Sequence, residues 1–106
     1  KNLLQKTLFL LMYSFLVFKV FHPNEDGIND YWKIKGISRN FYQSGSVSIF
    51  NRYGKLISKH NIDDIGWDGT YNGKILSSNN YWFYAELVDV NGKVRTRSGN
   101  FSLLRN

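Results

Sequence analysis

Turn-forming residues recur every few positions from residue 21 onward, and this spacing constrains the fold more than any other feature of the sequence. Pairs such as Asp26-Gly27, Asn72-Gly73 and Asn91-Gly92 favour chain reversal, because Asn, Asp and Gly tolerate backbone conformations that most residues avoid. Between the turns lie short runs of strand-like composition, for example Ser46–Ile49, in which polar and apolar residues alternate. Short strands at intervals of about 8–12 residues are typical of a sandwich or barrel.

The strongest predicted strand covers residues 81–88, and its odd positions would face a core. Asn91-Gly92 is expected to close a tight hairpin, because both residues tolerate a positive φ. The returning strand starts near Lys93 and ends at Leu104. We therefore predict an all-β, antiparallel sandwich of about seven strands over residues 21–105, with Trp67 at the core edge. The side chains expected to point inward are Val47, Ile49, Tyr81, Phe83, Ala85, Leu87, Phe101 and Leu103.

Residues 1–20 differ in composition from the rest of the chain. Lys1 and Lys6 flank an apolar run, Thr7–Phe18. A positive segment followed by about 7–15 apolar residues is the signature of a secretory signal peptide, and a membrane-spanning helix needs about 20. Bulky residues stand where a small-residue cleavage site is expected, so a packed apolar helix or a strand at 17–21 are the alternatives. We expect an apolar leader over residues 1–20 and one domain over residues 21–106.

The chain carries a net charge of +6 and no cysteine. Without cysteine it has no disulfide, no thiolate nucleophile and no cysteine-built zinc site, and its redox compartment stays open. The densest basic cluster is Lys93, Arg95 and Arg97, which alternate and so share one strand face. A basic face can bind nucleic acid or an anionic membrane, but a solvated strand face explains it more simply. We expect no nucleic-acid partner.

The segment 24–30 gathers oxygen-bearing side chains around a glycine. Asn24, Asp26 and Asp30 surround Gly27, which permits a sharp turn. Calcium takes six to eight oxygen ligands, and these three side chains with the Ile28 carbonyl form a candidate site. A hydrogen-bonded Asx turn explains the same residues without a metal. Calcium is thus a possible cofactor, and both interpretations stay open.

Catalytic chemistry finds little support in the sequence. Asp63, Asp64 and Asp68 lie close together, but a glycosidase needs two carboxylates at a fixed separation in a cleft. His22 and His60 are far apart, and no serine stands in a nucleophile elbow. We therefore expect no catalytic residue and no enzyme activity.

Three aromatic residues suggest an alternative function. Trp32, Trp82 and Tyr84 are candidates for stacking on sugar rings, as in a carbohydrate-binding or adhesin module. In a small sandwich, core or edge packing explains such residues more often.

Four segments, in order, resemble the gliding-motility-associated C-terminal domains, which are the type B sorting domains of bacterial type IX secretion. The segments are 21–30, 47–56, 67–74 and the closing hairpin of residues 81–87 and 99–105. Tyr53 replaces the family's usual Trp as a packed aromatic. A Pro-x-Gly-Thr turn is common in the family where Ser77, Asn79 and Asn80 stand here; Asn79 can still adopt a positive φ, so the turn is expected to survive. The residues that carry the resemblance are Phe21, Pro23, Gly27, Asn29, Asn51, Arg52, Gly54, Trp67, Asp68, Gly69, Gly73, Lys74, Tyr81, Phe101 and Arg105.

This resemblance implies an immunoglobulin-like sandwich that acts as an address label. Such a domain directs an attached cargo through the periplasm and across the outer membrane, and it brings no catalytic residue. Its expected partners are the type IX translocon and an outer-membrane-associated protein. The cargo region expected on the N-terminal side is missing from this sequence. The expected location is the outer cell surface or the medium.

Overall fold

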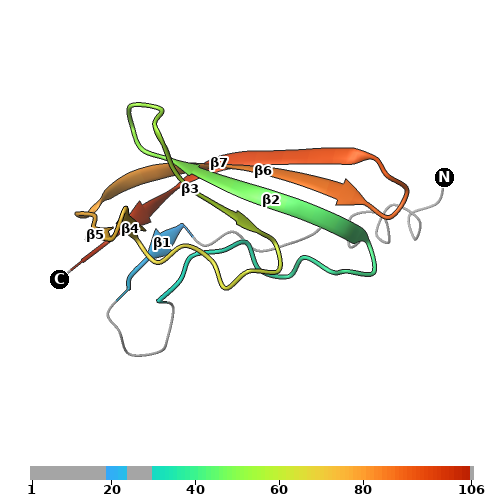
Figure 1. Ribbon diagram of the computed structural model, residues 1–106, viewed down its shortest axis with the longest axis horizontal. Helices are drawn as coiled ribbons and strands as arrows, with labels where there is room; N and C mark the ends of the chain where they lie inside the picture. Colours follow the sequence, from blue (N-terminus) through green and yellow to red (C-terminus); the bar gives the residue numbers. More distant parts are fainter. Residues whose placement is uncertain (1–18, 24–29, 106) are drawn as a thin grey trace.

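The computed structural model describes residues 19–23 and 30–105, and these form an all-β domain (Figure 1). No helix long and apolar enough to cross a membrane occurs among the described residues. The prediction of an all-β chain with about seven strands is confirmed. Within the described part the strands are β1 (Val20–Phe21), β2 (Tyr42–Phe50), β3 (Leu56–Asn61), β4 (Thr70–Tyr71), β5 (Lys74–Ile75), β6 (Asn79–Asp89) and β7 (Val94–Leu103).

The strands form a five-stranded sheet in the order β1-β7-β6-β2-β3 and a small hairpin, β4-β5. One layer of the immunoglobulin-like sandwich is the large sheet, and the other consists of the hairpin and the irregular segments before β2 and after β3 (Figure 1). A bridge between Trp32 and Trp67 joins those two segments. Backbone hydrogen bonds of this bridge, from the Trp32 N–H to the Trp67 carbonyl and from the Trp67 N–H to the Trp32 carbonyl, therefore connect the irregular parts of the second layer.

One pairing differs from the predicted antiparallel pattern. The first strand runs parallel to the last, with Val20 opposite Ser102 and Phe21 opposite Leu103. Hairpins force neighbouring strands to alternate in direction, whereas no hairpin connects β1 with β7. Their relative direction is consequently set by packing across the whole domain.

The core lies beneath β6 and β7, and all eight side chains predicted to point inward are buried. Along β6 the burial alternates strictly from Tyr81 to Asp89, as a sheet with one wet face requires. Trp67 was expected at the core edge but is only 3% exposed, with its ring 6.0 Å from that of Phe21. It is a core residue because the segment that carries it folds under the sheet.

Two hairpin turns share one design. In segment 51–55, the side chain of the first residue, Asn51, accepts hydrogen bonds from the backbone N–H groups of the third and fifth residues. In segment 89–93, the side chain of Asp89 does the same, and all four distances are 2.9–3.0 Å. Only the fourth residue, Gly54 or Gly92, has a positive φ in these turns. The hairpin turn predicted at Asn91-Gly92 is present between β6 and β7, and Gly92 takes a positive φ there. A turn with two successive positive φ angles occurs at Asn72-Gly73, with φ of 52° and 78°.

The expected turn at Asn79 is absent. Asn79 begins β6 and pairs with Leu103, and Asn72 is the non-glycine residue with a positive φ in the described ranges. The pairing of Asn79 and Asn80 with β7 makes both residues part of a strand.

Candidate functional site

Three segments far apart in the sequence meet at one end of the sandwich, which we call the hairpin end: the β2–β3 turn with Leu56 (51–56), the hairpin segment 68–75, and residues 104–105. They lie opposite the β6–β7 turn (Figure 1). The Lys55 ammonium lies 4.7 Å from the centroid of the Tyr71 ring and so connects the first two segments. Arg105 connects the third, because its guanidinium donates hydrogen bonds to the carbonyls of Gly69 and Leu76. Motifs that resemble the sorting family thus converge here.

Arg105 packs closely against Gly69. Gly69 has a φ of 82°, and a Cβ atom at that position would lie 2.6 Å from the Arg105 guanidinium. The Arg105 backbone N–H also donates to the Ser78 hydroxyl, at 2.7 Å. Burial raises the pKa of the nearby Tyr81 hydroxyl, and the positive charge of Arg105 partly offsets that rise. Gly69 and Arg105 therefore act together to attach the C-terminal residues to the hairpin.

The β2–β3 turn presents an arginine and a tyrosine to solvent. Tyr53 is 78% exposed, so the prediction that it packs like the family's tryptophan is wrong. It occupies the third turn position, beyond the edge of the sheet, where no core residue reaches it. The Arg52 guanidinium carbon lies 4.9 Å from the Tyr53 ring centroid and one of its N–H groups donates to the Tyr53 hydroxyl at 2.8 Å. Asn51 holds this turn, and Gly54 closes it.

The three carboxylates considered for catalysis serve separate local contacts. Asp68 accepts hydrogen bonds from the Thr70 N–H and hydroxyl, at 3.1 and 2.7 Å. Asp64 accepts from the Asn61 N–H at 2.9 Å, and Asp63 forms an exposed ion pair with Arg39 at 3.3 Å. Asp64 and Asp68 thus fix local turns, and Asp63 pairs with an arginine at the surface.

The proposed calcium ligands Asn24, Asp26 and Ile28 lie outside the described residues, as do Gly27 and Asn29. Phe21 is buried in β1, Pro23 is half-buried where the chain leaves it, and Asp30 is half-buried where the described chain resumes. Residues 19–23 and 30–105 contain no group of three His, Cys, Asp or Glu side chains that could hold a metal ion. The calcium site stays a prediction.

The aromatic residues considered for sugar binding divide into two classes. Trp32 is 2% exposed and stacks on Phe101, with ring centroids 4.1 Å apart, so it cannot meet a ligand. Trp82 and Tyr84 are 39% and 43% exposed and share the outer face of β6. They remain available for contact with another molecule.

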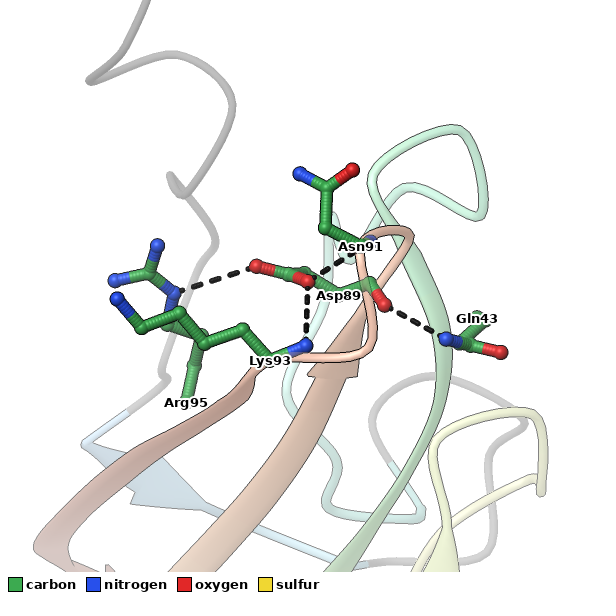
Figure 2. A network of polar contacts seen from close by, with 5 residues as sticks. All are labelled: Gln43, Asp89, Asn91, Lys93 and Arg95. Carbon is green, nitrogen blue, oxygen red and sulfur yellow. Dashed lines mark hydrogen bonds and ion pairs between the residues drawn. The ribbon is translucent and has the colours of Figure 1, made fainter.

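The basic cluster at the start of β7, made of Lys93, Arg95 and Arg97, is partly used within the fold. Asp89 is buried, and its carboxylate accepts hydrogen bonds from the Asn91 and Lys93 N–H groups (Figure 2). Arg95 forms an ion pair with the same carboxylate, at 3.5 Å. The Gln43 amide donates to the Asp89 carbonyl at 2.9 Å. The hydrogen bond from Lys93 is the largest cause that lowers the pKa of Asp89, and burial opposes it. Arg95 is thus committed to an internal carboxylate.

His60 is a second buried ionisable residue. It lies on β3 opposite Val47, is 7% exposed, and neither ring nitrogen has a hydrogen-bond partner. Burial lowers the pKa of His60 from 6.5; Asp64 opposes this, and Lys33 adds to it. The neutral imidazole is therefore the form that fits the core.

We expect this histidine to make the domain less stable in mild acid. Between pH 6.5 and the lower folded pKa the unfolded chain binds more protons, so the free energy of unfolding falls as pH falls. Urea denaturation at neutral pH and at about pH 5 measures the loss. His60→Leu should remove most of this pH dependence, whereas His22→Gln should retain it. An unchanged pH dependence in His60→Leu would contradict the prediction.

Comparison with known proteins gives one family match. The family described as CHU_C type IX secretion signal domain matches residues 15–103, which is most of the chain. The match begins inside the predicted leader, and the boundary at residue 20 stays a prediction. No curated protein matches. The crystal structure of CopC from Methylosinus trichosporium OB3b is similar with a TM-score of 0.46 and 17% identity, over 60% of this chain and 65% of that one.

Proposed function

The chain belongs to the type IX secretion signal domain family, and from this premise we propose that it directs an attached cargo protein across the outer membrane. A sorting signal of this family is recognised by the secretion machinery, and the protein that carries it is exported toward the cell surface or the outside. In our proposal the domain performs no catalysis, and recognition depends on its folded surface. The partners are the translocon and an outer-membrane-associated protein, and the cargo lies on the N-terminal side.

The observation that carries the proposal is the family match over residues 15–103. The contacts at the hairpin end support it, because Lys55 and Arg105 bring together motifs that lie up to about fifty residues apart. The carboxylates of Asp63, Asp64 and Asp68 are occupied with turns and an exposed ion pair. A surface built from separate segments that contact one another is suited to recognition by another protein.

We expect a reporter fused in front of the complete chain, behind a signal peptide, to reach the medium or cell surface of a type IX-competent bacterium. The measurement is the reporter fraction outside the outer membrane. Two controls are the reporter without the domain and the same fusion in a type IX-deficient strain, and both should keep the reporter in the periplasm. Equal export with and without the domain would refute the proposed function.

A further inference from the structure

The hairpin end combines exposed apolar side chains with a local excess of positive charge. Tyr53 is 78% exposed, Ile75 71%, Leu56 49% and Leu104 46%. In the described segments that form this end, the cations are Arg52, Lys55, Lys74 and Arg105, against the single carboxylate of Asp68. That carboxylate already accepts two hydrogen bonds from Thr70.

Contacts within the fold hold these side chains in place before any partner arrives. Arg52 and Tyr53 hold each other through a hydrogen bond of 2.8 Å and a stacked cation. Lys55 lies over Tyr71, and Tyr71 pairs with Lys74 across the β4–β5 hairpin. Arginine and tyrosine are enriched among residues that dominate binding energy, and preorganisation reduces the entropy lost on association.

We propose that the hairpin end docks onto an acidic protein surface of the secretion machinery, with Tyr53 and Ile75 entering apolar sites between carboxylates. This inference rests on the proposed function and names the chemistry of its partner. Charge complementarity selects the occupant: four cations at one end attract a surface rich in Asp and Glu. The exposed apolar side chains would be buried on docking and so add contact area. A partner that bound through charge alone would leave these apolar side chains in contact with water.

The second hairpin turn offers a matched design for the test. Residues 51–55 and 89–93 form the same hydrogen-bonded turn, so Val90 and Asn91 stand where Arg52 and Tyr53 stand. The double variant Arg52→Val/Tyr53→Asn therefore removes the exposed pair and keeps a turn sequence that the fold accepts. The reciprocal variant Val90→Arg/Asn91→Tyr places the pair at the opposite end (Figure 1).

The experiment measures export of the reporter fused to the complete chain, together with the melting temperature of each purified variant. Two variants change the hairpin end: Arg52→Val/Tyr53→Asn and Arg52→Glu/Lys74→Glu. Both should have melting temperatures within about 4 °C of the parent, and both should export the reporter at least about tenfold less. Val90→Arg/Asn91→Tyr and Lys93→Glu should export normally. Normal export by both folded hairpin-end variants would overturn the inference and leave the proposed function intact. Failure of the unmodified fusion would overturn both.

A photo-crosslinking amino acid at position 53 then identifies the class of occupant. We expect a covalent adduct with a protein during export, lost when Arg52→Glu/Lys74→Glu is added, and no such adduct from position 65. Ile65 is a matched exposed position, 66% accessible. The purified chain is also mixed with vesicles of phosphatidylglycerol and phosphatidylethanolamine. Binding to these vesicles that depends on Arg52 and Lys74, without a protein adduct, would overturn the protein partner in favour of a lipid surface.

Discussion

Replacing Phe101 by alanine is expected to remove a large part of the stability of the domain. Phe101 is 2% exposed and stacks on Trp32, with ring centroids 4.1 Å apart and planes at 8°. Its ring also lies 6.0 Å from that of Trp67. The lost burial and the cavity left behind cost about 3–5 kcal/mol, against a total of about 5–15 kcal/mol for a typical domain. The melting temperature should fall by more than about 12 °C.

The matched control is Leu104→Ala, at the residue directly after the end of β7. Leu104 is 46% exposed, so we expect its replacement to cost less than about 1 kcal/mol. Deleting residues 101–106 removes Phe101 and Leu103 together and should abolish both folding and export of the fused reporter. Thermal denaturation followed by tryptophan fluorescence measures all three. Similar melting temperatures for Phe101→Ala and Leu104→Ala would show that the aromatic stack does not hold the layers together.

Replacing Gly66 by alanine is the second change for which we expect a large effect. Gly66 has a φ of 118°, and a Cβ atom there would lie 2.6 Å from the Trp32 carbonyl oxygen. That oxygen accepts a hydrogen bond from the Trp67 N–H at 2.9 Å, and the Trp32 N–H donates to the Trp67 carbonyl at 2.7 Å. Backbone strain and loss of the two bonds should together cost about 2–6 kcal/mol.

The Gly73→Ala variant separates the cost of the steric clash at Gly66 from the cost of the backbone strain. Gly73 also has a positive φ, 78°, but nothing lies within 4 Å of a Cβ atom placed there. We expect that variant to lose only about 1–2 kcal/mol, the cost of the left-handed conformation. Urea denaturation of both variants gives the two free energies of unfolding. If Gly66→Ala lost no more than Gly73→Ala, the bridge between the two tryptophans would not be needed for stability.

The residues of the candidate site were found only in part from the sequence. Arg105, Gly69 and Lys74 were identified by resemblance, and the structure places them together at the hairpin end. The contact of Lys55 with Tyr71 was missed, because no local pattern reports which loops meet. The repeated turn design was missed as well, although its signal, Asn or Asp followed by Gly-Lys three residues later, is present at 51–55 and 89–93.

The sequence by itself determined the central strands, at 46–49, 81–88 and from Lys93 to Leu104, and their inner faces. Alternation along 81–88 assigned Phe83 and Leu87 to the core, because successive side chains of a strand point to opposite faces. Only the tertiary structure decided what covers that core. Trp32 and Trp67 lie in irregular segments without periodicity, and their burial depends on a bridge between positions 35 residues apart. The same holds for Tyr53, whose exposure depends on the turn extending beyond the sheet, and for the parallel β1–β7 pair, whose direction no hairpin sets. Local patterns record the period of a strand, whereas contacts between distant segments depend on how the whole chain packs.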